Sequence, residues 1–280
     1  MISWRDSPPV SVIVPTKNSI RTIRDCLSSI KKQTYKNSEI IVVDNQSTDG
    51  TFEVANEFTE ECYEHGPERS AQRNFGAARA SGKYLLFIDS DMILTPKVVE
   101  ECVSSCMEKD AVGAYIPEKI MGEGFFIKVR NFEREFYTGT VIDAIRFIRK
   151  DVFELVNGFD EMLTGPEDWD LDRRIREKGN LIIINSPLLH NEGKFDVNNY
   201  IRKKEYYIKK GLEAYKKKWG NDKQVKMQLG AYYRLWKVFI ENGKWKRLFR
   251  HPILMAGMYY LRLRVGLVYI FNKKKIPENG

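Results

Sequence analysis

The sequence predicts an α/β fold in which a mostly parallel sheet is flanked by helices and followed by a C-terminal appendage of basic helices. Short β-branched runs alternate with segments of helical periodicity in the first part of the 280-residue chain, which is the pattern of strands joined by crossover helices. The charge balance then changes. Residues 201–280 hold 21 Lys and Arg against 5 Asp and Glu, a balance of +16, whereas the first 200 residues carry −8. We therefore expect two parts, residues 1–195 and 196–280, with different partners.

Two strand and helix units open the chain. Residues 10–15 and 39–44 are short runs rich in Val and Ile, and each predicts a buried strand. Apolar residues at helical spacing predict helices over residues 19–32 and around 51–58. The second strand ends on Asp44, which is followed by the turn sequence NQSTDGT. Asp44 is therefore either a ligand-binding residue at a strand end or the cap of its own turn.

A third helix, over residues 71–80 and capped by Gly82, leads into the most informative strand. Residues 84–88 are continuously apolar, and the run stops at Asp89, Ser90 and Asp91. Ligands bind beyond the carboxyl ends of the strands in open α/β sheets, and carboxylates on alternate residues suit a divalent cation that also holds phosphates. Asp and Ser are also ordinary turn residues, so the three residues alone are a weak signal.

The second half contains further strands, expected at 111–120, 143–150 and 181–185, and a second group of acids. In GPEDWDLDRRIREKG, Gly165 and Pro166 place Glu167 and Asp168 in the first turn of a helix. Acids there interact favourably with the helix dipole, which is the simpler explanation. The functional alternative is a general base, which contributes roughly 10²- to 10⁴-fold to a rate.

Four segments in register resemble family 2 glycosyltransferases, which have the GT-A fold. They are SVIVPTKNS, IIVVDNQSTDGT, RSAQRNFGAARASGKYLLFIDSDMIL and GFDEMLTGPEDWDLDRRIREKG, and they span roughly residues 10–190. Four motifs in order are far more specific than any one of them. The resemblance implies a nucleoside-diphosphate sugar as donor, a divalent metal (Mn or Mg) in a DXD motif, and inversion at the anomeric carbon.

The resemblance also assigns roles to individual residues. It makes Asp168 the general base and Glu167 its neighbour that helps to hold the acceptor. Asp44 would accept the ring N–H of uracil, for which a carboxylate is well suited, so a UDP-sugar is favoured. The implied donor-binding residues are Pro15, Thr16, Asn18, Asp44, Arg73, Asp89 and Ser90, and the implied metal ligands are Asp91, Asp89 and His190.

The tail offers no catalytic motif. Three basic, aromatic helices are expected at 199–219, 224–241 and 251–272. The last is apolar but carries Arg262 and Arg264 near its middle, and a charge at the centre of a spanning helix costs roughly 2.5 to 3.5 kcal/mol. An in-plane helix tolerates such charges. We therefore expect a cytoplasmic enzyme held peripherally at the inner face of the membrane, acting on a glycan or lipid-linked acceptor in polysaccharide biosynthesis.

Two other functions compete with this interpretation. A nucleotidyltransferase also combines an α/β sheet with metal-binding acids, and it would release diphosphate. A non-catalytic nucleic-acid-binding protein would explain the basic tail, but no nucleic-acid-binding motif accompanies it, so no nucleic-acid partner is expected. The fingerprints GxGxxG and GxxxxGK are both missing, which removes the main support for NAD or ATP binding. The four cysteines have no ligand-like pairing, which fits a reducing compartment. Cys102 and Cys106, four residues apart on one helix face, are predicted to be buried thiols.

Overall fold

The computed structural model describes residues 7–273, with the backbone alone for residues 269 and 271–273. The chain forms two compact units. The sheet unit takes in the described residues up to 119 together with 143–161 and 167–191, and the helical unit takes in 120–142, 162–166 and the described residues from 192 onward. The helical unit therefore contains two segments, 120–142 and 162–166, that precede the predicted boundary at residue 195. The assignment of residues 1–195 to catalysis stays a proposal.

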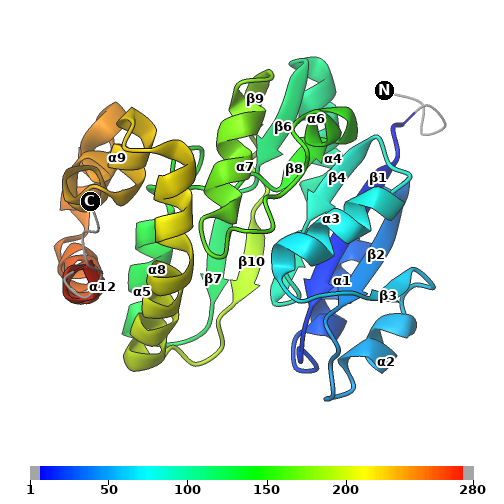
Figure 1. Ribbon diagram of the computed structural model, residues 1–280, viewed down its shortest axis with the longest axis horizontal. Helices are drawn as coiled ribbons and strands as arrows, with labels where there is room; N and C mark the ends of the chain where they lie inside the picture. Colours follow the sequence, from blue (N-terminus) through cyan, green and yellow to red (C-terminus); the bar gives the residue numbers. More distant parts are fainter. Residues whose placement is uncertain (1–6, 274–280) are drawn as a thin grey trace. The chain divides into compact units, whose positions relative to one another are not determined.

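A seven-stranded, mostly parallel sheet forms the sheet unit, as predicted (Figure 1). Its strands run in the order β3-β2-β1-β4-β8-β6-β9. The strand β8 is antiparallel to both of its neighbours, and the other strand pairs of this sheet are parallel. The strands are β1 Val10–Thr16, β2 Ser38–Asp44, β3 Cys62–Glu64, β4 Tyr84–Phe87, β6 Ala111–Tyr115, β8 Phe147–Arg149 and β9 Asn180–Ile183.

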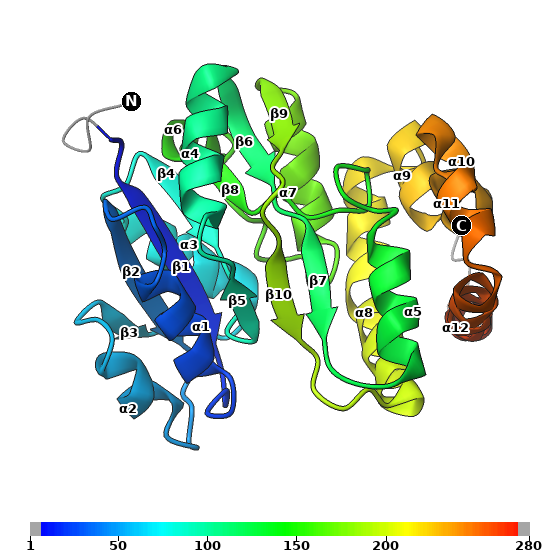
Figure 2. The same ribbon diagram turned by 180° about the vertical axis from the view of Figure 1, so that it is seen from behind.

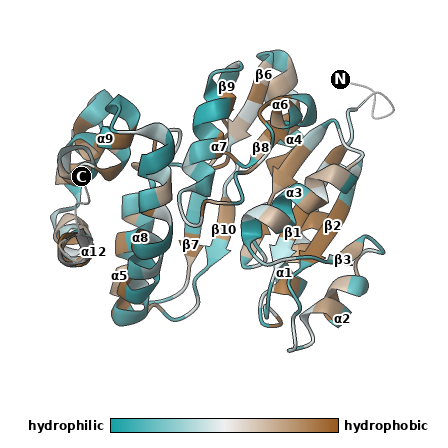
Figure 3. Cartoon of the chain, viewed as in Figure 1, coloured by the Kyte–Doolittle hydropathy of each residue, from teal (hydrophilic) through white to brown (hydrophobic). Residues whose placement is uncertain are grey.

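Helices cover both faces of this sheet, so its central strands are buried and continuously apolar (Figure 3). One core cluster contains residues of α1 (Ile23–Lys31) and α4 (Val98–Glu108), which lie in front of the sheet in Figure 2. The other cluster contains residues of α3 (Arg69–Arg79), α6 (Lys150–Leu155) and α7 (Glu167–Arg176). The short helix α2 covers Thr51–Asn56. The thiols of Cys102 and Cys106 are buried, as predicted, and Cys26 is buried as well.

A smaller three-stranded sheet has the order β5-β10-β7. It consists of β5 Met92–Leu94, β10 Leu188–Asn191 and β7 Glu118–Met121. The single strand expected over residues 111–120 is in fact β6 and β7, which are separated by Ile116 and Pro117. Proline has no N–H to donate to a ladder, so a break at this position is the expected physical result. The antiparallel pairing of β5 with β10 places His190 opposite Met92.

The predicted capping role of Gly82 is wrong. The helix α3 ends at Arg79 with Ala80 as its C-cap, and Gly82 instead lies against the first residues of β1. A Cβ at Gly82 would come within 2.5 Å of the backbone nitrogen of Ser11. The Gly82 N–H donates to Ser11 Oγ at 2.8 Å. Glycine is therefore required by a close approach of two backbones rather than by a helix end.

The described part of the helical unit contains α5 Phe125–Arg134, α8 Val197–Trp219, α9 Lys223–Leu229, the π-helix η2 Tyr233–Lys237, α10 Val238–Ile240, the 3₁₀-helix η3 Glu241–Gly243, α11 Trp245–Arg250 and α12 Pro252–Lys273. The helix α12 packs on α5 and α8. The continuous helix expected over 224–241 is interrupted at Gly230, which is extended with a ψ of 135°. Within residues 7–273, no helix combines the length and apolarity needed to cross a bilayer.

Candidate functional site

The carboxyl ends of β1, β2 and β4 bring most of the predicted site residues together. Thr16 ends β1, Asp44 ends β2, and Asp89 to Asp91 follow β4 after one intervening residue, Ile88. Parallel strands place their carboxyl ends at one edge of a sheet, so these side chains share that edge. Ile88 N donates to Ile13 O at 3.0 Å, which continues the pairing up to the acids.

Arg73 is at the centre of the site. It is carried by α3, and only 1% of its side chain is exposed. Its Nη2 donates to Asp89 Oδ1 at 2.7 Å, and its Nη1 donates to Asp168 Oδ1 at 2.9 Å. One buried guanidinium therefore joins the first acid of the DSD sequence to the predicted general base, 79 residues later in the chain. The planar guanidinium, with several donors in fixed positions, is suited to such a bridge.

The charges of this bridge stabilise one another. Burial opposes ionisation of Asp89, but the guanidinium groups of Arg73 and Arg146 hold the pKa of that carboxyl well below its usual range. Arg146 Nη1 lies 3.6 Å from Asp89 Oδ2, so both carboxylate oxygens face a cation. Burial also opposes the charge of Arg73, yet Asp168 and Asp89 raise its pKa above the ordinary value. Asp89 is thus held as an anion at the edge of the sheet.

Glu167 and Asp168, at the start of α7, differ in exposure. The Glu167 side chain is 2% exposed and lies 3.1 Å from Arg69 Nη2. Burial, and then the charge of Asp168, raise the pKa of Glu167. The Asp168 side chain is 24% exposed. Of the two acids, Asp168 is therefore the one that an acceptor from solution can reach.

Asp91 and His190 lie side by side in the sheet unit. His190 Nε2 is 3.3 Å from Asp91 Oδ2, and its Nδ1 is 2.8 Å from Glu118 Oε1. Burial opposes the charge of His190, but the hydrogen bonds with Asp91 and Glu118 raise its pKa to about 9. Arg146 Nη2 lies 3.7 Å from Glu118, so a continuous series of charges runs from Asp168 to Asp91.

The donors at Asp91 fit a divalent cation. Asp91 Oδ1 is buried and has no hydrogen-bond partner among the described residues. A metal-binding histidine usually has a carboxylate hydrogen-bonded to the ring nitrogen that does not bind the metal. Glu118 is in this position at Nδ1 of His190. No three His, Cys, Asp or Glu side chains gather as a metal cage within residues 7–273. Magnesium-like sites use one or two carboxylates together with substrate phosphates, so a cage is not needed.

Asp44 binds its own turn in this structure. Its carboxylate accepts hydrogen bonds from Ser47 N at 2.7 Å and from Ser47 Oγ at 2.5 Å. The capping role considered from the sequence is therefore present. The role of Asp44 in binding a base stays a prediction, and a carboxylate with about four lone-pair sites has capacity for both roles.

The remaining donor-binding candidates lie in the loops beside Asp44. Asn18 N donates to Ser47 Oγ at 2.8 Å, and Asn18 Oδ1 accepts from Thr48 N at 2.9 Å. Asn18 therefore ties the loop after β1 to the loop after β2. Ser90 Oγ donates to Ser19 Oγ at 2.8 Å, and Pro15 lies inside β1 opposite Val43.

Three of the predicted site residues carry a buried polar atom that has no hydrogen-bond partner among the described residues. These atoms are Thr16 Oγ1, Arg73 Nε and Asp91 Oδ1. Buried polar atoms in native proteins are nearly always hydrogen-bonded, so three such atoms in predicted ligand-binding residues are consistent with a polar ligand.

Sequence reasoning missed Arg146 and Glu118. Arg146 lies in a segment that the sequence identified only as a strand. It reaches Asp89 because β8 pairs antiparallel with β4, and Phe87 N donates to Arg146 O at 2.9 Å. Glu118 opens β7, and nothing in its spacing relates it to His190. The available signal was an arginine within a predicted strand, where a charged side chain is unusual.

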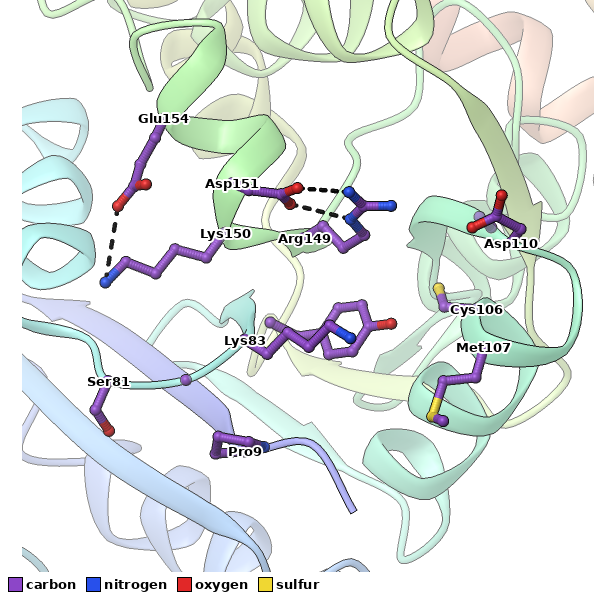
Figure 4. A pocket seen from close by; sticks show the side chains of 13 residues that line it. Pro9, Ser81, Lys83, Cys106, Met107, Asp110, Arg149, Lys150, Asp151 and Glu154 are labelled. Carbon is purple, nitrogen blue, oxygen red and sulfur yellow. Dashed lines mark hydrogen bonds and ion pairs between the residues drawn. The ribbon is translucent and has the colours of Figure 1, made fainter. Parts of the chain in front are cut away.

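A cavity of about 790 Å³ lies at the opposite end of the strands and is not this site (Figure 4). Pro9 and Lys83, which line it, directly precede β1 and β4. Four of its charged residues form two ion pairs: Arg149 binds Asp151 at 2.5 Å, and Lys150 lies 3.7 Å from Glu154. The cavity is lined by none of the predicted site residues.

Comparison with known proteins identifies the family. A glycosyltransferase GlyA of Streptococcus pneumoniae is 36% identical over 138 residues, which are 43% of this chain and 20% of that protein. The chain thus spans only a fifth of that relative's length. A GalNAc(5)-diNAcBac-PP-undecaprenol beta-1,3-glucosyltransferase of Campylobacter jejuni is 26% identical and covers 89% of this chain and 76% of its own length.

The solved structures agree on the fold. Mannosyltransferase PcManGT from Pyrobaculum calidifontis, solved with GDP-Man and Mn²⁺, matches with a TM-score of 0.63 at 17% identity, and the match covers 97% of this chain and 89% of that one. At this identity the likeness concerns the fold alone. The sequence profile of Glycosyl transferase family 2 matches residues 11–158, more than half of the chain. The strand-end acids, the α/β sheet and this match together assign the chain to glycosyltransferase family 2.

Proposed function

We propose that the protein transfers a sugar, with inversion and with the aid of a divalent metal, from a nucleoside-diphosphate sugar to a hydroxyl of a glycan or lipid-linked acceptor. The observation that carries this proposal is the buried Arg73, which joins Asp89 to Asp168. A donor-side acid and an acceptor-side base are then held at a fixed separation by one rigid group. Such positioning is what a displacement between two bound substrates requires.

Asp91 and His190 would hold the cation, Mn²⁺ or Mg²⁺, with Asp89 beside them. When bound, the cation supplies positive charge to the diphosphate as it leaves the sugar. The protein's own contribution is orientation. Glu118 fixes the imidazole of His190 at 2.8 Å, and Arg146 fixes both Glu118 and Asp89. Imidazole and carboxylate together are acceptable ligands for manganese.

Asp168 acts as the general base in this proposal. The acceptor oxygen forms a bond to the anomeric carbon while the bond from that carbon to the diphosphate oxygen breaks. The hydroxyl proton passes to the Asp168 carboxylate. Attack opposite the leaving group inverts the anomeric carbon. Glu167, buried against Arg69, holds the start of α7 so that Asp168 faces the acceptor.

The donor's base and ribose would lie over the loops after β1 and β2. Asp44 would accept the N–H of a uracil ring, which favours a UDP-sugar. Pro15, Thr16, Asn18 and Ser90 would line the same pocket. The unpartnered Thr16 Oγ1 supports this arrangement, because a bound nucleotide would give it a partner.

The helical unit supports peripheral attachment to the cytoplasmic face of a membrane. Five large apolar side chains are exposed on α12, at spacings of three, four or seven residues: Ile253, Tyr260, Leu263, Leu267 and Ile270. Residues with this spacing share one face of a helix. Met258 and Leu261 are buried on the other side. An apolar face on a strongly basic tail is the composition of an in-plane membrane helix.

A lipid-linked acceptor follows naturally from this attachment. The name of the Campylobacter relative gives an undecaprenol diphosphate as the carrier of its acceptor. A membrane-attached enzyme meets such an acceptor by diffusion in two dimensions. We therefore place this protein in the synthesis of an envelope glycan or polysaccharide.

A donor screen tests the core of the proposal. Thermal unfolding of the full chain is measured with a panel of UDP- and GDP-sugars, with and without Mn²⁺ or Mg²⁺. A ligand at about 100 times its dissociation constant stabilises by about 2.7 kcal/mol. Metal-dependent stabilisation by one donor, followed by release of its nucleoside diphosphate, supports the proposal. Release of diphosphate instead would identify a nucleotidyltransferase, and salt-dependent RNA binding without donor stabilisation would identify a nucleic-acid-binding protein.

A further inference from the structure

Three basic side chains from three different helices converge inside the helical unit. Arg130 comes from α5, Lys204 from α8 and Arg262 from α12, and we call them the basic cluster. Arg130 and Arg262 are each only 7% exposed. The ring of Tyr200 lies between two of them, with Arg130 Cζ at 4.9 Å and Lys204 Nζ at 5.5 Å from its centroid. The position of the cluster follows from the packing of α12 on α5 and α8.

The acids beside the basic cluster do not balance it. Glu133, which is buried, accepts from Arg130 Nη1, and its Oε1 lies 2.9 Å from Arg262 Nε. Tyr137 also donates to Glu133, at 2.6 Å, so this carboxylate accepts two hydrogen bonds and also faces the charge of Arg262. Glu192 lies 3.4 Å from Arg130 Nη2. Lys204 makes no ion pair with a carboxylate of the described residues.

Three guanidinium nitrogens of the cluster are also left without a hydrogen-bond acceptor among the described residues. They are Arg130 Nε, Arg262 Nε and Arg262 Nη2, all buried. Arg262 instead directs Nη1 to the carbonyl of Arg234 and stacks over Phe239 at 4.5 Å. A buried N–H donor without an acceptor raises the free energy of the folded protein, and more so when the donor group is charged. The arrangement therefore favours binding of an acceptor from outside the protein.

The crowding of like charges is visible in the pKa values. Burial, followed by the positive charges of Arg130 and Arg234, lowers the pKa of Lys204 to about 7. Burial and the charge of Arg130 also lower the pKa of Arg262. Burying cations without enough counter-charge destabilises a fold by several kcal/mol per ion. An anion bound among these residues would offset that cost.

We propose that the basic cluster of Arg130, Lys204 and Arg262 is a binding site for a phosphate or diphosphate group, the group that a lipid-linked acceptor carries. The cluster has three basic side chains, and only two carboxylates of the described residues, those of Glu133 and Glu192, lie beside it. When Lys204 is protonated, one positive charge is therefore left without a counter-charge. A phosphate group supplies up to two negative charges, with three acceptor oxygens for a guanidinium fork and an ammonium. A carboxylate would supply one charge and two oxygens. This assignment rests on the proposed function for the identity of the carrier, but the anion site itself does not.

The test measures thermal unfolding of the full chain with increasing sodium pyrophosphate in EDTA, at constant ionic strength. EDTA removes divalent cations, so the metal-dependent donor site does not contribute. We compare Lys204→Met with Lys203→Met, which removes the same charge from the neighbouring, exposed position on α8. Without ligand, the Lys204 variant is expected to melt higher than the parent. It is also expected to bind pyrophosphate at least about tenfold more weakly, because it loses a charge-assisted hydrogen bond to the anion.

The Lys203 variant is expected to bind pyrophosphate within about twofold of the parent, because exposed charges contribute little. Equal weakening in the two variants, or no stabilisation of the parent by pyrophosphate, would overturn the proposal. A further arm uses Asp91→Asn, in which pyrophosphate stabilisation must persist even though donor turnover is lost. Failure of the donor site and failure of the anion site are thereby separated.

The source of the phosphate group is distinguished by two probes. Binding of inorganic pyrophosphate shows that the cluster accepts a free or carrier-linked diphosphate. Binding of phosphatidylcholine vesicles that contain phosphatidic acid shows that it accepts the phosphate of a lipid headgroup. Lys204-dependent binding to pyrophosphate at a salt concentration that abolishes vesicle binding assigns the cluster to the acceptor's diphosphate. Lys204-dependent binding to vesicles as well extends the same site to headgroup phosphates.

Discussion

Arg73 and Asp168 form an ion pair at 2.9 Å between the middle of α3 and the first turn of α7, in which the guanidinium is buried. Because the other Nη of Arg73 is bound to Asp89, removal of the guanidinium would leave two carboxylates uncompensated. Arg73→Met is therefore expected to lower the free energy of unfolding by about 3 to 5 kcal/mol. Urea denaturation followed by circular dichroism measures this change.

Arg73→Lys separates position from charge. A lysine keeps one positive charge but cannot bridge two carboxylates in a fixed plane. We expect a folded protein with kcat reduced by at least about 10-fold. Arg69→Lys, at the more exposed arginine beside Glu167, is the control and should retain most of the turnover. Similar kinetics for the two variants would remove Arg73 from its positioning role.

Asp91→Asn is expected to abolish metal-dependent turnover and leave the fold intact. The substitution keeps the shape of the side chain but removes the charge that a divalent ion requires. Turnover is measured against increasing Mn²⁺, and thermal unfolding checks the fold. Glu118→Gln should weaken the metal response by about 10- to 100-fold, as loss of a hydrogen bond to a ligating histidine commonly does. A saturating metal response of Asp91→Asn equal to that of the parent contradicts the assignment.

Asp168→Asn is expected to lower kcat by at least about 10²-fold while donor affinity changes little. The base acts on the acceptor proton only in the transition state, so binding of the nucleotide sugar does not depend on it. Donor affinity is followed by thermal stabilisation and kcat by transfer to a hydroxyl acceptor. Parent-like transfer by Asp168→Asn would show that another group takes the proton.

Leu263→Asp combined with Leu267→Asp tests membrane attachment by the exposed face of α12. Burial of a leucine contributes about 1.5 to 3 kcal/mol, so the pair should reduce partitioning into vesicles by more than about 100-fold. Flotation with vesicles containing anionic lipid is measured at low and high salt, because the Lys and Arg contribution is screened. Leu155→Asp, at an exposed leucine of the sheet unit, is the matched control. Equal flotation of all three proteins would leave α12 without this role.

The stability of the unliganded protein should depend on pH through Lys204. Its pKa is about 7 in the folded protein, against 10.5 for an ordinary lysine, so the unfolded chain binds more protons between these values. Stability from this group therefore rises with pH above 7, by at most about 1.4 kcal/mol per unit. The groups that act on Lys204 are Arg130, Glu133 and Arg134 of α5, and Arg234 of η2.

Urea denaturation between pH 7 and 9 measures this dependence. The gain in stability of Lys204→Met over the parent should be largest near pH 7 and shrink toward pH 9. Subtraction of the parent curve removes the contribution of the buried thiols and tyrosines, which the two proteins share. A constant difference between the curves would contradict the low pKa.

The strand ends were predictable because their signals are local. The run over residues 84–88 identifies a buried strand by itself, and the Gly165 and Pro166 pair identifies the start of α7. The contact between Arg73 and Asp168 joins α3 to α7. These helices are far apart in the sequence, so no local sequence pattern predicts that the two side chains meet. Arg146 was out of reach for a topological reason: β8 enters the sheet antiparallel, between β4 and β6, and sequence periodicity carries no information on strand direction.

In the C-terminal helices, too, the elements could be predicted from the sequence but the contacts between them could not. Composition predicted basic helices, and α8 and α12 lie close to their expected ranges. From the sequence we interpreted Arg262 as a charge that argues against a membrane-spanning helix. In the structure its side chain is buried against Glu133. Burial of a charged side chain depends on partners from other helices, and helical periodicity shows only which side of its own helix the residue occupies.

The pairing of β5 with β10 determines which sequence changes this site tolerates. His190 reaches Asp91 because its strand is aligned, residue against residue, with the strand that follows Asp91. Side chains alternate across a strand, so one inserted or deleted residue between Leu188 and His190 would turn the imidazole to the opposite surface without altering any chemical group. Length variation in this segment is therefore more damaging than most substitutions there, and a sequence comparison that counts only identities would miss the loss.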